Sequence, residues 1–228
     1  MKLPGVTLVC FNGLNKSKEH FDCLYAINES IKEIEFDRIL FLTAYKTLNE
    51  AFVIGNKKIE IVEVKPHSKR EYNFFMINKL SDWIKTPYVL TIQSDGFILN
   101  PSRWDKRFYD YDYIGAPWPN IYKGVRVGNG GFSWRSKKLL DDCRNIKHNN
   151  VANEDGVICI NNRKMLMDHG NKFAPLEIAI LFSTELPIPE FNPQDYTKTF
   201  GFHNSSSDQK IYDKYALKYK PLNKNPLR

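Results

Sequence analysis

Four ionisable side chains stand at the ends of apolar segments, and together they could carry out a metal-assisted group transfer. Asp95 follows the apolar run 89–92, Glu154 and Asp155 precede another apolar stretch, and His203 follows an aromatic segment. A carboxylate and an imidazole can hold a divalent cation that neutralises a leaving diphosphate. A second carboxylate can take the proton of an acceptor hydroxyl. These residue types, taken jointly, predict a transferase site.

Each of these residues also has a purely structural explanation, which the sequence alone leaves open. Asp95 and Gly96 have the composition of a turn. Glu154 and Asp155 would stabilise the start of a helix through its dipole, with no other role. His203 is followed by an asparagine and three serines, which is typical of a loop.

A glycine-rich segment, residues 128–131 (GNGG), is a further candidate for ligand contact. It lacks the spacings of the dinucleotide-binding and P-loop motifs. So many flexible residues in a row are costly unless the backbone passes close to something. The segment therefore predicts a ligand-contacting loop, and a plain tight connection is the alternative.

The elements that must position these residues can be read from hydrophobic periodicity. Apolar runs at 6–11, 38–43, 59–64 and 89–96 predict strands, and the alternation of apolar and acidic residues at 59–64 places that strand near a sheet edge. The run 89–96 reads as a buried central strand, so Asp95 should emerge at the carboxyl edge, where open α/β folds bind ligands.

Helical spacing of apolar residues predicts a helix over about 17–35 and a second helix over 68–84. The second begins at the capping box formed by Ser68 and Glu71. Further helices are expected at about 136–144 and from about residue 153. The alternation of strands and helices predicts a single α/β domain with a mixed, mainly parallel, Rossmann-like central sheet flanked by helices.

Bulk composition agrees with such a domain. The chain has 228 residues, of which 42% are hydrophobic and 26% charged, so fibrous and disordered classes are excluded. The net charge of +7 favours anionic partners, and the dense basic stretch is the tail 214–228. The four cysteines show no disulfide or zinc spacing, and Cys10 and Cys159 read as core residues. With no apolar run of membrane-spanning length, we expect a soluble, cytoplasmic protein without a transmembrane segment.

The order of the motifs resembles a known family. The segments 91–96 (TIQSDG), 111–118 (YDYIGAPW), 128–133 (GNGGFS), 153–155 (NED), 182–185 (FSTE) and 200–203 (FGFH) are similar to those of the DUF5672 family, whose members are similar to GT-A glycosyltransferases. The resemblance covers roughly residues 85–205. It implies a GT-A-like fold and a hexosyl- or pentosyltransferase activity.

The resemblance implies a cation, Mn²⁺ or Mg²⁺, on the diphosphate of a nucleoside-diphosphate sugar, with a UDP-sugar as the expected donor. Residues 93–95 occupy the place of the GT-A Asp-x-Asp motif, so Asp95 matches the metal-binding carboxylate. Gln93 departs from the motif because an amide supplies no charge, which makes metal dependence less secure. His203 matches the carboxyl-terminal histidine that many GT-A enzymes use as a second metal ligand.

The resemblance also assigns catalytic roles. Asp155 is implied as the base of an inverting transfer, with Glu154 as a sugar-hydroxyl or capping contact, while a retaining outcome stays open. Within the segments that carry the resemblance, the implied donor contacts are Gln93, Ser94, Trp118, Gly128, Asn129, Gly130 and Gly131.

The amino-terminal half is expected to hold the nucleotide. In GT-A folds the base lies over the ends of the first two strands, which implicates Phe11, Asn12 and Thr43, and Arg70 could reach the diphosphate. The implied division is a nucleotide-binding half at about 1–96, an acceptor and catalytic half at about 97–205, and a basic tail at 206–228.

Two functions follow as hypotheses. The first is a metal-assisted glycosyltransferase whose acceptor is a glycan or a modified nucleobase. The second is a catalytically inactive GT-A-like module that binds glycan or nucleic acid through its basic, aromatic-rich surface. The amide of Gln93 in place of a carboxylate keeps the second hypothesis open.

Overall fold

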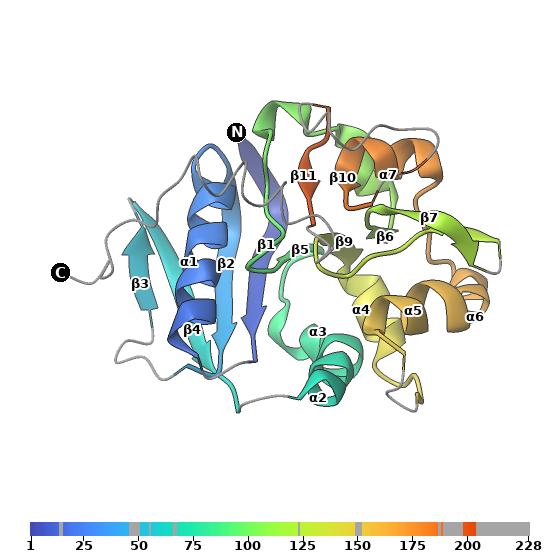
Figure 1. The fold of residues 1–228 in the computed structure, drawn as a ribbon, viewed down its shortest axis with the longest axis horizontal. Helices are drawn as coiled ribbons and strands as arrows, with labels where there is room; N and C mark the ends of the chain where they lie inside the picture. Colours follow the sequence, from blue (N-terminus) through green and yellow to red (C-terminus); the bar gives the residue numbers. More distant parts are fainter. Residues whose placement is uncertain are drawn as a thin grey trace.

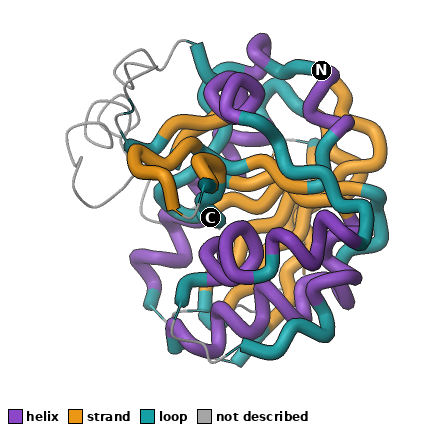
Figure 2. Tube along the Cα trace, turned by 90° about the vertical axis from the view of Figure 1, so that its right-hand side faces the viewer, coloured by secondary structure: helices purple, strands orange, loops and turns teal. Residues whose placement is uncertain are grey.

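A seven-stranded sheet runs through the molecule and organises the rest of the chain (Figure 1). The computed structural model describes residues 1–13, 16–45, 51–54, 56–65, 68–122, 124–148, 152–186, 188 and 198–203. The predicted basic tail lies outside these residues. The strand order is β3-β4-β2-β1-β5-β9-β6. Figure 2 shows the strands passing through the middle of the molecule, with helices on the outside.

The sheet is mixed and mainly parallel, which confirms the predicted fold class. Its parallel part is made of β1 (Lys2–Asn12), β2 (Glu35–Thr43), β4 (Lys57–Glu63) and β5 (Tyr88–Ile92). The strands β3 (Ala51–Ile54), β9 (Ser133–Ser136) and β6 (Tyr113–Ile114) are each antiparallel to a neighbour. The strand β3 was not predicted, and it takes the edge position beside β4.

Helices cover both faces of β1 because its apolar side chains alternate between them. Leu8 and Cys10 pack with the helix α1 (Ser17–Ile31), while Val9 and Phe11 pack on the opposite face. That opposite face is covered by a continuous helical segment of three parts: α2 (Lys69–Phe74), the π-helical η1 (Phe75–Lys79) and α3 (Leu80–Trp83).

The start of α2 is formed as predicted. The Ser68 hydroxyl accepts the backbone N–H of Glu71, and the Glu71 side chain accepts the backbone N–H of Ser68. This capping box fixes the first turn of α2, which carries Lys69 and, one turn further, Tyr72 and Asn73.

The second half of the chain adds short elements around β9 and β6. Its helices are η2 (Pro101–Arg103), η3 (Lys106–Asp110), α4 (Lys137–Cys143), α5 (Glu154–Gly156), the π-helical η4 (Val157–Asn161), α6 (Arg163–Asp168) and α7 (Leu176–Phe182). Two small sheets complete it: parallel β10 (Ser183–Thr184) with β11 (Gly201–Phe202), and antiparallel β7 (Pro117–Tyr122) with β8 (Val125–Val127).

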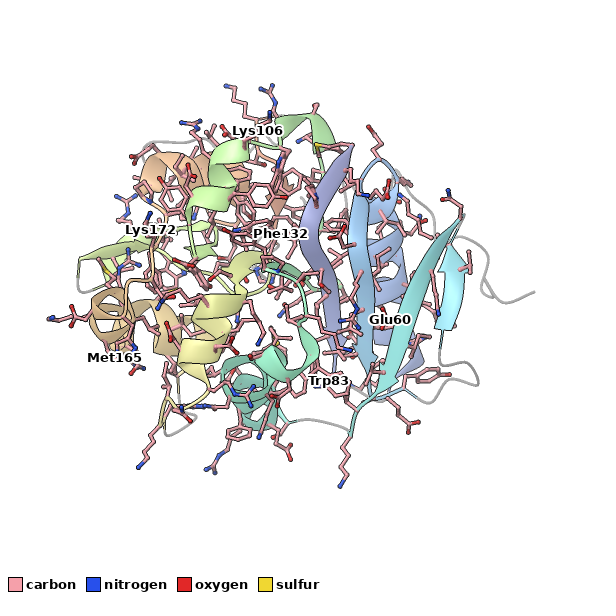
Figure 3. All side chains as sticks on the ribbon, turned by 180° about the vertical axis from the view of Figure 1, so that it is seen from behind. Glu60, Trp83, Lys106, Phe132, Met165 and Lys172 are labelled. Carbon is pink, nitrogen blue, oxygen red and sulfur yellow. The ribbon has the colours of Figure 1, made fainter. Side chains whose placement is uncertain are left out.

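An aromatic core holds this half together. Phe132 lies near the middle of the molecule (Figure 3), with its ring 5.1 Å from that of Phe182 and 6.1 Å from that of Phe200. All four cysteines are buried and free, which confirms the prediction for Cys10 and Cys159. Within the described part of the chain, every helix is too short or too polar to cross a membrane.

Candidate active site

Asp95 stands at the tip of a tight turn that follows the central strand β5. The backbones of Gln93 and Gly96 exchange hydrogen bonds of 3.1 and 3.2 Å, so Ser94 and Asp95 form the two-residue tip. The turn interpretation and the functional one are therefore compatible. The turn holds the Asp95 carboxylate at the carboxyl end of a buried strand.

His203 is brought to this turn from the far end of the chain by the small β10–β11 sheet. Its backbone N–H donates to Thr184 at 2.9 Å, immediately after the pairing of Phe202 with Thr184. The Nε2 atom of His203 lies 3.4 Å from Asp95 Oδ1 and 3.2 Å from Gln93 Oε1. The expectation that residues 95 and 203 converge is thus confirmed.

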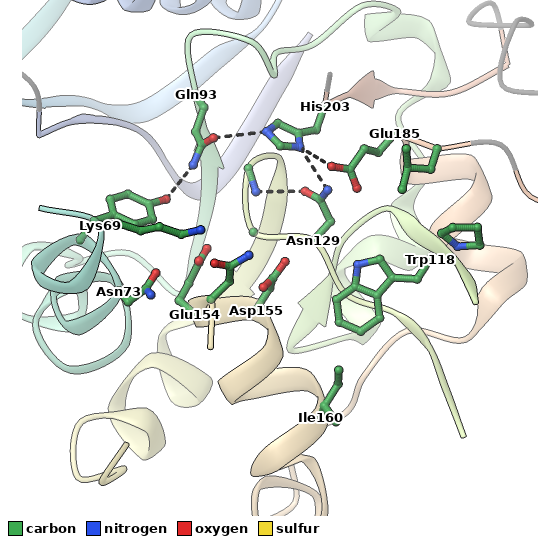
Figure 4. A pocket seen from close by; sticks show the side chains of 16 residues that line it. Lys69, Asn73, Gln93, Trp118, Asn129, Glu154, Asp155, Ile160, Glu185 and His203 are labelled. Atoms are coloured by element: carbon green, nitrogen blue, oxygen red, sulfur yellow. Dashed lines mark hydrogen bonds and ion pairs between the residues drawn. The ribbon is translucent and has the colours of Figure 1, made fainter. Parts of the chain in front are cut away.

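The other ring nitrogen of His203 faces a residue that sequence reasoning missed. Glu185 Oε1 lies 3.0 Å from Nδ1 (Figure 4). Burial alone would lower the pKa of His203, but the carboxylates of Asp95 and Glu185 raise it to about 10. The two carboxylates therefore favour the protonated ring, and a metal bound at Nε2 would have to displace that proton.

The residues around His203 fit a divalent cation. Neighbouring ligands of an ion with bonds of about 2.1 Å lie about 3 Å apart, close to the separation of Asp95 Oδ1 and His203 Nε2. Tyr72 accepts the Gln93 amide N–H at 2.7 Å, which turns the Gln93 oxygen toward the same nitrogen. Glu185 occupies the position of a carboxylate that orients a metal-binding histidine.

The protein itself offers only a small charged ligand set. Among the described residues, no group of three or more His, Cys, Asp or Glu side chains is arranged to hold a metal ion. Asp95, His203 and the Gln93 amide would leave several coordination positions to a diphosphate and water, which is common for Mg²⁺ and similar ions.

The glycine loop of residues 128–131 is shaped by the side chains that press on it. A Cβ atom at Gly131 would lie 2.1 Å from His203 Nε2, and one at Gly130 would lie 1.7 Å from Glu154 Oε1. At Gly128 the added atom would lie 1.9 Å from the Trp118 ring. The glycines are therefore needed for the backbone to approach three side chains of the candidate site.

Asn129 joins this loop to His203. It is buried in the left-handed conformation, with φ of 66°, and its Oδ1 accepts the Gly131 N–H at 3.0 Å. The amide group then faces His203 Nδ1 at 3.1 Å. An asparagine tolerates this backbone conformation better than most residues, so the same side chain makes the turn and contacts the histidine.

The acidic pair begins α5, as predicted, but the two carboxylates have different surroundings. Glu154 is buried, and its Oε1 lies 3.4 Å from Nη2 of Arg135, whose side chain is completely buried. Asp155 accepts the backbone N–H of Gly156 at 2.7 Å. Burial, followed by the negative charge of Glu154, raises the pKa of Asp155 to about 6.

Most of these residues, though not Asp95, Gly128 or Arg135, line one cleft of about 490 Å³ (Figure 4). Lys69 and Asn73 lie on one side of it and Trp118 and Ile160 on the other, with the acidic pair between them. Predicted residues that line the cleft are Gln93, Trp118, Asn129, Gly130, Gly131, Glu154, Asp155 and His203. The lining residues that were not predicted are Lys69, Tyr72, Asn73, Pro119, Asn153, Ile160, Glu185 and Leu186.

Six predicted donor contacts, one of them Gly128, do not line this cleft, and neither does the predicted metal ligand Asp95, which contacts His203. Phe11, Asn12 and Thr43 are buried at the ends of β1 and β2, where Phe11 packs on Tyr72 and Phe75. Ser94 lies in the turn beside Asp95, and Arg70 lies on the exposed side of α2, one residue from Lys69. Consecutive residues of an α-helix point about 100° apart around its axis, so Lys69 lines the cleft while Arg70 points away from it.

Solved structures with this fold are glycosyltransferases. A galactosyltransferase, LgtC, solved with donor and acceptor sugar analogues, has a TM-score of 0.52 at 12% identity, covering 90% of this chain and 87% of its own. A glycosyltransferase involved in glycosylation of the major capsid protein of PBCV-1 has a TM-score of 0.53 at 13% identity, covering 94% and 100%. GlyE of Streptococcus pneumoniae TIGR4 has a TM-score of 0.50 at 14% identity, covering 92% and 60%.

At these identities the likeness establishes the fold, which is that of GT-A glycosyltransferases. No curated protein matches the sequence. A family model described as a protein of unknown function, DUF5672, matches residues 58–203, which include every charged residue of the cleft. The chain is therefore a member of the DUF5672 family with a GT-A-like fold.

Proposed function

We propose that the protein is a metal-dependent glycosyltransferase that moves a sugar from a nucleoside diphosphate, with UDP as the expected nucleotide, to an acceptor hydroxyl. One observation carries the proposal: one cleft is lined both by His203, which contacts Asp95, and by Asp155, a carboxylate of raised pKa. Solved neighbours that share the fold are glycosyltransferases, one of them holding donor and acceptor sugar analogues.

Asp95, His203 and the Gln93 oxygen would hold Mn²⁺ or Mg²⁺ at the diphosphate end of the cleft. When bound, the cation supplies neutralisation of the charge that develops on the leaving diphosphate. Lys69, which lines the cleft at the start of α2, adds a cation on the same side as Asn73. This arrangement favours Lys69 over Arg70 as the side chain that meets the phosphates.

Asp155 acts as the base. Its carboxylate takes the proton of the acceptor hydroxyl while the acceptor oxygen bonds to the anomeric carbon of the sugar. The bond from that carbon to the diphosphate breaks, and its electron pair leaves with the diphosphate. Attack opposite the leaving group inverts the anomeric centre. A pKa of about 6 leaves Asp155 mostly ionised near neutral pH and more basic than an ordinary aspartate.

The acceptor would approach from the side of Trp118. There Trp118, Pro119, Ile160 and Leu186 line the cleft and form an apolar wall that suits a sugar ring or a base. We retain the division into a nucleotide-binding half at about 1–96 and an acceptor half at about 97–205, although the central sheet continues into the second half through β9 and β6.

The test combines binding and turnover. A panel of nucleotide sugars is screened by thermal shift with and without Mn²⁺, and the donors that bind are assayed for hydrolysis and transfer. We expect Asp95→Ala to abolish metal-dependent donor binding and Asp155→Ala to spare donor binding while removing transfer. Arg70→Ala is the matched surface control next to Lys69. Full activity in both aspartate variants would refute the proposal.

The second candidate is a catalytically inactive module that binds glycan or nucleic acid. The uncharged Gln93 and the small charged ligand set favour it. Calorimetry separates the two, because only the enzyme needs divalent metal to bind a sugar nucleotide. Salt-sensitive binding to DNA without any donor binding would favour the inactive module.

A further inference from the structure

Arg135 is a buried cation with no place in the transfer reaction as described so far. It lies on β9 below the glycine loop, with none of its side chain exposed. Its Nε donates to the Ser133 hydroxyl at 3.0 Å, its Nη2 faces Glu154 at 3.4 Å, and its guanidinium lies 5.5 Å from the centre of the Tyr113 ring. Among the described residues, its Nη1 has no hydrogen-bond partner.

Stability does not account for such a residue. Burying an ion pair costs desolvation that its attraction often fails to repay, and apolar replacements are frequently as stable. An unpaired Nη1 adds to that cost. The position of the pair is more informative. The partner of Arg135 is Glu154, the residue immediately before the candidate base Asp155, and Arg135 and Glu154 both lie against Gly130.

We propose that Arg135 is a positioning residue that holds the Glu154 carboxylate as its own ion-pair partner and thereby leaves Asp155 as the carboxylate that takes the acceptor proton. This inference rests on the proposed function. Without the guanidinium, the negative charge of Glu154 would act on Asp155 with no buried positive charge to oppose it, and the pKa of Asp155 would rise further. A larger share of Asp155 would then be protonated near neutral pH, and unable to act as the base.

Other groups that face Asp155 do not replace Arg135. Glu185, after β10, raises the pKa of Asp155 as Glu154 does, and burial raises the pKa of Tyr72 on α2, Tyr113 on β6 and Cys159 on η4, so none of these groups supplies a positive charge. Lys69 lines the same cleft but is exposed at the start of α2. Among the described groups, Arg135 is thus the completely buried cation that lowers the pKa of Asp155, whereas His203 lies in the same cleft and faces Asp95 and Glu185.

The test measures how the ionisation of Asp155 responds to four variants. Arg135→Met removes the charge and keeps an unbranched side chain, Glu154→Gln removes the partner, and the double variant removes both. Arg38→Met is the matched control, because Arg38 on β2 forms a pair with Glu60 on β4 at 2.7 Å, and neither residue lines the cleft. Carbon-13 NMR of aspartate-labelled protein follows the Asp155 carboxyl, assigned with Asp155→Asn, and pH–rate profiles follow donor turnover.

We expect Arg135→Met to move the Asp155 midpoint up by about one pH unit, Glu154→Gln to move it down, and the double variant to return it toward wild type. A one-unit rise from about 6 lowers turnover about five-fold at pH 6 and leaves it nearly unchanged at pH 9. Arg38→Met should leave the midpoint where it is.

An unchanged NMR midpoint in folded Arg135→Met, or an equal loss of turnover at every pH, would overturn the inference and leave Arg135 with a packing role. If Arg135→Met alone fails to fold, the double variant still provides a test. It removes both members of the Arg135–Glu154 pair, so neither of them is left buried without its partner. If the Asp155 midpoints move as expected but the protein turns over no nucleotide sugar, the proposed function is refuted. The effect of the Arg135–Glu154 ion pair on the pKa of Asp155 is then still supported.

Discussion

Replacing Gly131 with alanine should destabilise the protein through a single side chain, that of His203. The added Cβ would lie 2.1 Å from Nε2, and reaching the 3.4 Å of ordinary contact requires a movement of about 1.3 Å. The ring cannot yield freely, because it is held by Glu185 at 3.0 Å and by Gln93 at 3.2 Å. We therefore expect a loss of about 1–3 kcal/mol, the usual cost of overpacking.

The assay is urea unfolding of Gly131→Ala, His203→Ala and the double variant. Removing the ring relieves the clash, so the two changes should be non-additive by at least about 1 kcal/mol. Gly124→Ala is the control: its φ is +81° and nothing lies within 4 Å, so it should cost about 1–2 kcal/mol whether or not His203 is present. Additive effects of Gly131→Ala and His203→Ala would show that His203 does not pack on the loop as described.

Three further predictions concern the cleft and its supports. Asp155→Asn should stabilise the protein at pH 7 by up to about 3 kcal/mol, because a folded pKa of about 6 against an ordinary 3.8 makes the ionised form favour the unfolded state. In urea unfolding, wild-type stability should therefore fall as pH rises from about 4 through 6 by more than that of the variant. Lys69→Met should weaken donor binding about ten-fold in calorimetry, whereas Arg70→Met should not, since only Lys69 lines the cleft. Asn78→Leu should lower the free energy of unfolding by about 2–4 kcal/mol, because the Asn78 amide donates to three carbonyl groups that follow α4.

Local patterns predicted the elements that lie next to the site. The capping box at Ser68 and Glu71 correctly marks the start of α2, and the acidic residues at 154 and 155 correctly mark a helix start. The apolar run that ends near Asp95 is a central strand. These features depend on neighbours in sequence, so they can be read from one chain.

Residues that act through distant contacts were missed or misjudged. Nothing in the segment 133–136 indicates that Arg135 points into a buried site rather than outward, because a one-residue change of register reverses the faces of a strand. Glu185 was noted only as part of a motif, although it contacts His203. Arg70 was named as a diphosphate contact and Lys69 was not, because helical phase near a terminus depends on where the first turn begins.

The sequence by itself determined the fold class, the helix starts and the kinds of residue that could do chemistry, because propensity, periodicity and capping are local properties. Only the tertiary structure decided which carboxylate is paired with Arg135, which cation lines the cleft, and that residues 95 and 203 lie 3.4 Å apart. Those outcomes depend on strand register and on the close approach of the glycine loop to the side chains around it. Both bring together residues that are far apart in the sequence.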